Sequence, residues 1–307
     1  MRECGTGPYR RPGPRRYHSL NPTFPYSHIP LPSAYLFDLD GTLYQNNAAI
    51  PGAVDLIRRL KAQGTPCRFL TNTTSKPRSS IVTRLRGYGF PVENHEVFTA
   101  LLAGAELARS LECRTLMPLV RSEALEDLKG FELLGGTAVW SRSPVGDPSL
   151  GTGAGSGPIY NPDAVVVGDL AEDWSFDLLQ QGFTALRAGA RLIALSRDRY
   201  WMTGRGLTID AGPFVAALEY AAEVTSMVAG KPSAAFFDGA VESLHLAAGI
   251  PRDEIVMVGD DLRGDIEGAQ AAGYTGYLVR TGKYQEGQLA DLGIAPGRIL
   301  ESVAELL

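Results

Sequence analysis

The sequence has few cysteines, no excess of basic residues and no long hydrophobic run, and each shortage excludes a class of protein. The three cysteines, Cys4, Cys67 and Cys113, show neither metal-ligand spacing nor a disulfide framework. A formal net charge of −5 offers no basic surface for nucleic acid, so we expect no such partner. No apolar run approaches the roughly 18 residues that a membrane-spanning helix needs, so we expect no membrane partner. The scattered cysteines favour a reducing compartment, and we predict a cytoplasmic protein.

Residues 1–32 differ from the rest of the chain in composition. They contain seven prolines and five arginines but a single acidic residue, Glu3. Prolines at this density interrupt regular structure, so we predict a disordered extension. An Arg-rich, acid-poor leader for organellar import and an over-long start of the chain would look the same.

The remaining 275 residues alternate between short apolar runs and stretches with helical spacing of apolar residues. The runs at 34–37, 66–70, 164–167 and 254–258 are too short for buried helices and are typical of buried strands. From Asp38 to Thr71 is 33 residues, the length of one βαβ unit. This alternation predicts an α/β fold with a doubly wound, Rossmann-like parallel sheet.

Polar clusters follow four apolar runs at their carboxyl ends. They are Asp38 with Asp40, Thr71 with Asn72, Lys231, and Asp260 with Asp261 and Asp265. Ligands of open parallel α/β sheets bind outside the carboxyl ends of the strands, so the clusters are expected to converge. Each cluster alone also has an ordinary interpretation as an acidic turn, a helix cap or a surface lysine. Four clusters of complementary chemistry at matched strand ends favour one catalytic site.

The chemistry of these residues matches phosphoryl transfer. Asp38 is ionised at neutral pH and can attack phosphorus to form an aspartyl-phosphate. Asp40 points to the same side of an extended chain and can protonate the leaving group, then activate water. Mg²⁺ prefers oxygen ligands, and Asp38, Asp260 and the backbone carbonyl of Asp40 fit it.

The other clusters complete this prediction. Lys231 supplies a second positive charge, and Thr71 and Asn72 are expected to bind phosphoryl oxygens with nearby N–H groups. Asp265, and Asp261 near it, are expected to support Lys231 or the outer shell of the metal.

The spacing of the clusters indicates an inserted domain. Thr71 and Lys231 lie 160 residues apart, too far for one crossover connection, whereas Lys231 and Asp260 lie 29 residues apart. We therefore predict a core domain at 33–98 and 206–307 and an inserted domain at 99–205. Residues 141–162 are rich in Ser, Gly and Pro and predict a flexible loop within the insertion.

The four clusters resemble the four motifs of the haloacid dehalogenase (HAD) superfamily. The matching segments are Asp38-Leu39-Asp40-Gly41-Thr42-Leu43, Leu70-Thr71-Asn72, Gly230-Lys231-Pro232, and Gly259-Asp260-Asp261 with Asp265. The resemblance implies the phosphatase branch, because an Asp two residues after the nucleophile marks it, as Asp40 does here. The insertion resembles the C2 cap of the NagD-like group, which implies a cap that closes over the site and a possible homodimer through the cap.

Segments 210–220 and 278–284 resemble the phospholysine phosphohistidine inorganic pyrophosphate phosphatases and their relatives. This resemblance implies a small phosphomonoester, pyrophosphate or an N-phosphorylated compound as substrate. Arg199, Tyr200 and Trp201 follow a cap strand and are candidates for contacting it, although the aromatic pair can equally pack at the junction of cap and core.

Two other functions stay open at this point. A non-catalytic phosphate-binding or scaffold protein on the same fold would require a degraded motif, and none is visible. A phosphotransferase would use the same residues with an alcohol in place of water. A dehalogenase is disfavoured by Asp40 and Lys231 together.

Overall fold

The computed structural model describes residues 32–140, 160–203, 206–247 and 249–307. The predicted extension, apart from residue 32, and most of the predicted loop at 141–162 lie outside these residues. Among the described helices, none has both the length and the apolar character needed to cross a membrane.

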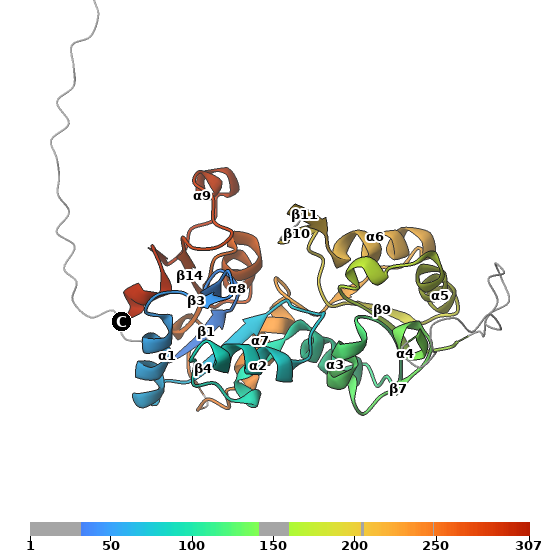
Figure 1. Ribbon diagram of the computed structural model, residues 1–307, viewed down its shortest axis with the longest axis horizontal. Coiled ribbons are helices and arrows are strands. Elements are labelled where there is room, and N and C mark those ends of the chain that lie inside the picture. Colours follow the sequence, from blue (N-terminus) through green and yellow to red (C-terminus); the bar gives the residue numbers. More distant parts are fainter. Residues whose placement is uncertain (1–31, 141–159, 204–205, 248) are drawn as a thin grey trace, which may run out of the picture. The chain divides into compact units, whose positions relative to one another are not determined.

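The first sheet has six parallel strands (Figure 1). The motifs at Asp38, Thr71 and Asp260 lie at its carboxyl edge or just beyond it, whereas Lys231 follows Met227–Val228, a strand of the other sheet. Its strands in spatial order are β15 (Arg298–Leu300), β14 (Thr275–Val279), β13 (Ile255–Gly259), β1 (Ala34–Asp38), β4 (Cys67–Thr71) and β5 (Val97–Thr99). All five residues of β1, β4 and β13 are buried, which matches their continuous apolar character.

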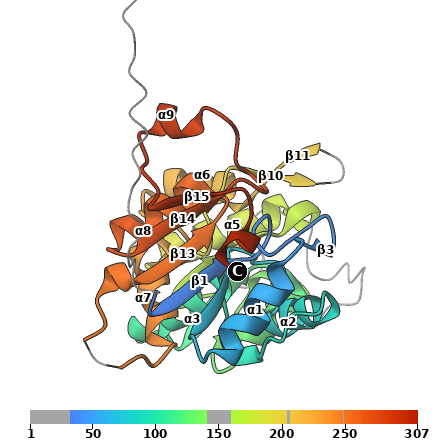
Figure 2. The same ribbon diagram turned by 90° about the vertical axis from the view of Figure 1, so that its left-hand side faces the viewer.

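Helices cover both faces of this sheet, because side chains alternate along each strand. Leu36 of β1 belongs to a buried cluster with Phe236, whereas the next residue, Phe37, belongs to another with Leu56. Figure 2 shows the two sides, with α7 and α8 on one side of β1 and β13 and α1 on the other. The helices near this sheet are α1 (Ala53–Ala62), α2 (Arg78–Gly87), α3 (Ala100–Ser110), α7 (Ala234–Glu242), α8 (Gly268–Ala271) and α9 (Gln288–Leu292). The predicted doubly wound α/β fold is confirmed.

A second parallel sheet is formed by the inserted segment. Its strands in spatial order are β12 (Met227–Val228), β9 (Arg191–Ala194), β8 (Ala164–Val167), β6 (Thr115–Leu119) and β7 (Glu132–Leu133). Its helices are α4 (Gly136–Trp140), α5 (Phe176–Arg187) and α6 (Ala211–Ala222). We refer to this sheet and these helices as the cap.

Short elements join the two sheets or extend from them. Two antiparallel pairs are β2 (Tyr44–Gln45) with β3 (Ala48–Ala49), and β10 (Tyr200–Thr203) with β11 (Gly206–Ile209). The tighter or wider helical turns are η1 (Asn94–Glu96), η2 (Ser122–Leu128), η3 (Ala171–Asp173), η4 (Arg252–Glu254), η5 (Leu262–Glu267) and η6 (Val303–Leu306).

The cap sheet extends beyond the predicted boundary at residue 205. Met227 of β12 pairs with Ile193 of β9, and Leu218 of α6 belongs to the same buried cluster as Leu178 of α5. Residues 206–228 therefore belong with the cap. Their strand pairs with β9, and their helix packs apolar side chains against those of α5.

The sequence at 299–307 predicts a terminal helix, and this prediction is wrong. Residues Arg298–Leu300 form β15, which pairs with β14, and η6 follows. The apolar residues in this segment have helical spacing, but the free edge of β14 offers backbone hydrogen-bond partners that local spacing does not reveal.

Candidate active site

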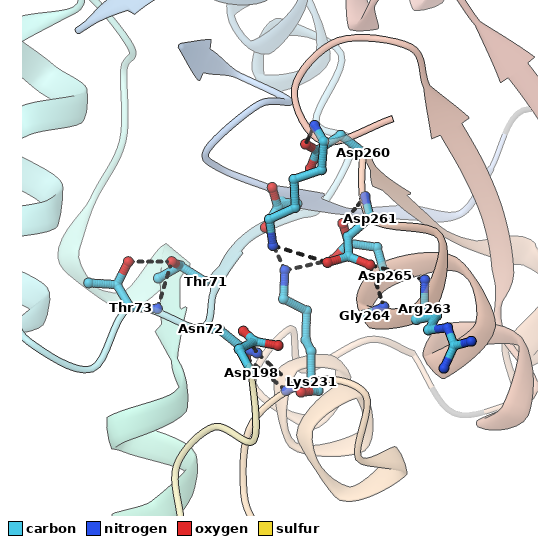
Figure 3. A network of polar contacts seen from close by, with 12 residues as sticks. Thr71, Asn72, Thr73, Asp198, Lys231, Asp260, Asp261, Arg263, Gly264 and Asp265 are labelled. Carbon is cyan, nitrogen blue, oxygen red and sulfur yellow. Dashed lines mark hydrogen bonds and ion pairs between the residues drawn. The ribbon is translucent and has the colours of Figure 1, made fainter. Parts of the chain in front are cut away.

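The carboxyl end of β1 places Asp38 beside Lys231. The Lys231 ammonium donates to Asp38 Oδ1 at 2.5 Å and to Asp265 Oδ1 at 2.6 Å. Figure 3 shows the Lys231 side chain extending toward Asp265. Burial alone would lower the pKa of Lys231, but the charges of Asp265 and Asp38 outweigh it and raise the pKa far above its usual range. Lys231 is therefore a fixed positive charge next to the predicted nucleophile.

Three buried carboxylates meet at this point. Oxygen atoms of Asp38, Asp260 and Asp265 lie within 4.8 Å of one another. Burial and the charges of Asp38 and Asp265 raise the pKa of Asp260. Burial and the charge of Asp38 also raise the pKa of Asp265, although Lys231 acts in the opposite direction. Like charges this close require compensating cations, and one lysine supplies a single charge.

The donor set fits a divalent cation. Both oxygens of Asp265 already accept hydrogen bonds. One accepts from Lys231 Nζ, and the other accepts from the Asp261 N–H at 3.1 Å. Asp38 and Asp260 each have one oxygen that accepts a hydrogen bond, from Lys231 Nζ and from the Lys283 N–H. They are neighbouring carboxylates of the kind that bind Mg²⁺. Burial makes their joint ionisation costly without a cation, so their place in the fold favours a metal site.

Asp40 lies two residues beyond the end of β1 and differs from Asp38 in exposure, because Asp38 is buried. Asp40 is solvent-exposed and forms an isolated bridge with Tyr44, while the Gly41 N–H donates to the Tyr44 carbonyl at 2.8 Å. Partial loss of water and the Asp38 charge raise the pKa of Asp40, against the opposing charges of Lys283 and Arg84. A carboxyl that is exposed and holds its proton more tightly than usual suits a general acid.

Thr71 and Asn72 lie at the end of β4, the strand next to β1. The Thr71 hydroxyl donates to Thr73 Oγ1 at 2.9 Å and accepts from the Thr73 N–H at 3.0 Å. Asn72 Oδ1 accepts from the Lys231 N–H at 2.9 Å, and its Nδ2 donates to the Lys231 carbonyl at 3.1 Å. The Asn72 amide thus fixes the Lys231 backbone, and phosphate binding by Thr71 and Asn72 stays a prediction.

Asp261 and Asp265 organise the turn after β13. Asp261 Oδ1 accepts from the N–H groups of Arg263 and Gly264 at 3.0 and 2.9 Å, at the start of η5. Asp265 is fully buried and contacts Lys231. Asp265 thus contacts Lys231, and the supporting roles of Asp261 and Asp265 stay a prediction.

Comparison with known proteins agrees with this geometry. Residues 35–133 match the family described as haloacid dehalogenase-like hydrolase, and residues 228–306 match a HAD-hydrolase-like family. Haloacid dehalogenase-like hydrolase domain-containing protein 2 of Bos taurus is 37% identical over 269 residues, which are 88% of this chain and 92% of that protein. The chain belongs to the haloacid dehalogenase-like hydrolase family.

Two further similarities place this HAD hydrolase within the family. Phospholysine phosphohistidine inorganic pyrophosphate phosphatase of Danio rerio is 33% identical over 264 residues, covering 83% of this chain and 86% of that protein. The structure of NagD from E. coli K-12 superposes with a TM-score of 0.73 at 25% identity, covering 90% of this chain and 99% of that one. The predicted resemblance to the NagD-like HAD phosphatases is confirmed.

The structure also brings two residues to this HAD site that sequence reasoning did not single out. Asn72 Nδ2 donates to Asp198 Oδ2 at 3.5 Å, and Lys283 Nζ donates to Asp261 Oδ2 at 3.0 Å. Asp198 follows the cap strand β9 by four residues, and Lys283 follows β14 by four residues. The motif residues were identified because they follow the ends of strands. The same signal would have identified Asp198 and Lys283.

The three cap candidates are next to Asp198 in the chain. Arg199 is exposed, and Tyr200 and Trp201 on β10 are 60% and 44% exposed. Their side chains face solvent, and within the part of the chain that the structure describes none of them forms a hydrogen bond or ion pair with the core motifs. Their role in substrate recognition stays a prediction.

Proposed function

We propose that this HAD hydrolase is a Mg²⁺-dependent phosphatase that acts through an aspartyl-phosphate on Asp38. The observation that carries the proposal is the buried Asp38 carboxylate at a strand end, between Lys231 and Asp260. A carboxylate that stays ionised beside cations can attack an anionic phosphoryl group, because the cations offset the repulsion.

In the first step an oxygen of Asp38 forms a bond to phosphorus, and the bond between phosphorus and the leaving group breaks. Asp40, whose pKa is raised, donates a proton to the leaving group. Lys231 is held by Asp265 and by the Asn72 amide, so it keeps its place beside Asp38. Bound by Asp38, Asp260 and the Asp40 carbonyl, Mg²⁺ would supply positive charge for the phosphoryl oxygens.

In the second step Asp40, now ionised, takes a proton from water. The water oxygen bonds to phosphorus, the bond to Asp38 breaks, and inorganic phosphate leaves. The same residue acts first as acid and then as base, which returns the site to its starting protonation state.

For the substrate we propose a small phosphomonoester, pyrophosphate or an N-phosphorylated compound. The 33% identity to a phospholysine phosphohistidine inorganic pyrophosphate phosphatase supports this range. The exposed Tyr200 and Trp201 at the cap offer surface for the part of the substrate away from phosphorus.

The test is hydrolysis of para-nitrophenyl phosphate and pyrophosphate by the full chain, with Mg²⁺ and after its removal by a chelator. We expect Mg²⁺-dependent turnover, a loss of at least about 10³-fold in kcat for Asp38→Asn, and a loss of about 10²- to 10⁴-fold for Asp40→Asn. Asp55→Asn, on an exposed face of α1, is the matched control and should be unchanged. Full turnover by Asp38→Asn would exclude Asp38 as the nucleophile.

A further inference from the structure

The segment that follows β14 closes over the metal-site residue Asp260. We call its three residues, Thr281, Gly282 and Lys283, the clasp. The Lys283 backbone N–H donates to Asp260 Oδ2 at 2.5 Å, and the Thr281 hydroxyl donates to the Gly41 carbonyl. The clasp therefore contacts both the turn after the nucleophile strand β1 and the carboxylate after β13.

Two glycines make this close contact possible. A Cβ atom on Gly282 would lie 1.9 Å from Asp260 Oδ2, and one on Gly41 would lie 2.2 Å from the same oxygen. Both glycines also have positive φ, 70° for Gly282 and 87° for Gly41, a conformation that other residues rarely adopt. The Asp260 carboxylate is thus packed against two backbones, with 2% of the residue exposed.

The clasp restrains the Asp260 carboxylate through a hydrogen bond from outside β13, the strand that Asp260 follows. Asp260 Oδ2 accepts from the backbone N–H of Lys283, in the loop after the neighbouring strand β14. Rotation of the carboxylate would break this hydrogen bond. The Lys283 side chain contributes separately, because it is 63% exposed and its ammonium pairs with Asp261. Backbone and side chain of Lys283 can therefore be tested apart.

We propose that the clasp is a positioning element that holds Asp260 in the orientation that binds the divalent cation. This inference rests on the proposed function in one respect, namely that Asp38 and Asp260 bind such a cation. Groups that orient a metal ligand typically change metal affinity or activity by about 10- to 100-fold when they are removed.

The experiment measures metal binding by the full chain without substrate. Mn²⁺ binding is followed by electron paramagnetic resonance and Mg²⁺ binding by calorimetry at a single pH, and the thermal midpoint without metal is recorded for each variant. The variants are Gly282→Ala, Thr281→Val, its matched control Thr281→Ser, and Lys283→Ala.

We expect Gly282→Ala to weaken Mn²⁺ binding by about 10- to 100-fold, because its methyl group occupies the place of Asp260 Oδ2. Thr281→Val should weaken it by about tenfold, and Thr281→Ser, which keeps the hydroxyl, should bind like the wild type. Lys283→Ala keeps the backbone N–H and removes the ion pair with Asp261 together with a positive charge near Asp40 and Asp260. Removing a positive charge does not oppose the binding of a cation, so no weakening is expected. For Thr281→Val, turnover should recover when Mg²⁺ is raised to saturation.

The outcomes separate this inference from the proposed function. If the wild type binds Mn²⁺ and folded Thr281→Val and Gly282→Ala bind it equally well, the clasp does not position Asp260. The proposal is also overturned if Thr281→Val and Gly282→Ala lose thermal stability but keep their affinity for Mn²⁺. It is likewise overturned if Lys283→Ala weakens Mn²⁺ binding as much as these two variants do. If Gly282→Ala does not fold, the Thr281 pair decides. If the wild type binds no divalent cation, the clasp has nothing to position and the proposed Mg²⁺ dependence fails with it.

Discussion

Lys231 balances the charges of the site at the scale of single residues. It is the one described lysine that contacts both Asp38 and Asp265, and all three side chains are buried. The same side chain therefore packs in the folded core and compensates the charge of Asp38. A buried ion pair that loses one partner leaves the other charge without compensation, which is more damaging than loss of an exposed pair.

Lys231→Met is expected to lower the free energy of unfolding by about 3 to 5 kcal/mol at pH 8, because two buried carboxylates remain unpaired. The loss should be smaller at pH 5, because burial raises the pKa of Asp265 and that carboxyl then takes up a proton. Urea unfolding of the wild type and the variant at pH 5 and pH 8 measures this loss in the free energy of unfolding. Lys76→Met removes an exposed pair with Glu123 and should change stability by less than about 1 kcal/mol, so an equal loss in both variants would contradict the argument.

Asp210 gives a pH-dependent prediction away from the proposed metal site. Its Oδ1 accepts from the Ala211 N–H at 2.6 Å at the start of α6, and burial, with the charges of Asp198 and Asp169, raises its pKa to about 6. A carboxyl whose pKa is raised on folding favours the folded state at low pH and loses that contribution as pH rises from about 4 through 6.

Asp210→Asn should therefore be more stable than the wild type at pH 7.5, by about 2 kcal/mol, and should match it near pH 4. Asparagine caps a helix as well as aspartate does, so the cap itself is kept. Urea midpoints across this range test the sign, and a variant that is less stable at pH 7.5 would show that the ionised carboxylate is needed.

At the scale of elements, the connection from β12 to Lys231 is held by three neighbours. A Cβ on Gly230 would lie 2.3 Å from the Leu195 carbonyl oxygen, 2.7 Å from Asn72 Oδ1 and 3.0 Å from the Ala100 Cβ. These contacts come from the loop after β9, the loop after β4 and the start of α3. The position of Lys231 thus depends on elements of both sheets meeting at one glycine.

Gly230→Ala is expected to cost about 1 to 3 kcal/mol of stability and to lower turnover, because a carbonyl oxygen and the Asn72 amide must move. Gly87→Ala in α2 has no atom within 4 Å of the added methyl group and should be neutral or stabilising by about 1 kcal/mol. Thermal unfolding and para-nitrophenyl phosphate turnover of both variants make the comparison. Wild-type turnover by Gly230→Ala would show that Lys231 tolerates a shift of its backbone.

At the scale of the whole molecule, the expected homodimer through the cap remains to be tested. The cap helices α5 and α6 contact each other and expose two large aromatic residues, Phe176 at 73% and Tyr220 at 89%. Exposed aromatic surface of this kind is enriched where proteins associate.

We predict a dimer by light scattering on a sizing column and a monomer for the double variant Phe176→Ser, Tyr220→Ser. Ile299→Ser, which changes an exposed apolar residue of β15 in the first sheet, is the control and should stay dimeric. A monomeric wild type at micromolar concentration would refute pairing through the cap.

The sequence by itself determined the features that depend on neighbouring residues and on the geometry of parallel strands. The apolar run at 34–37 followed by Asp38 defined a strand and its functional end. Three of the four predicted ends, those of β1, β4 and β13, converge because parallel strands share one carboxyl edge, so the grouping of Asp38 with Asp260 and Asp265 was predictable. Lys231 reaches Asp38 and Asp265 from the end of β12 in the cap sheet, which the shared edge does not explain. The spacing between motifs likewise revealed an inserted domain.

Tertiary structure alone decided what depends on contacts between distant segments. It assigned β12 to the cap sheet and turned the end of the chain into β15, because free strand edges accepted their backbones. It also placed the Asn72 amide on the Lys231 backbone, 159 residues away, and the Lys283 N–H on Asp260. Hydrogen-bond partners so far apart in the chain are selected by packing, which local spacing and side-chain chemistry do not encode.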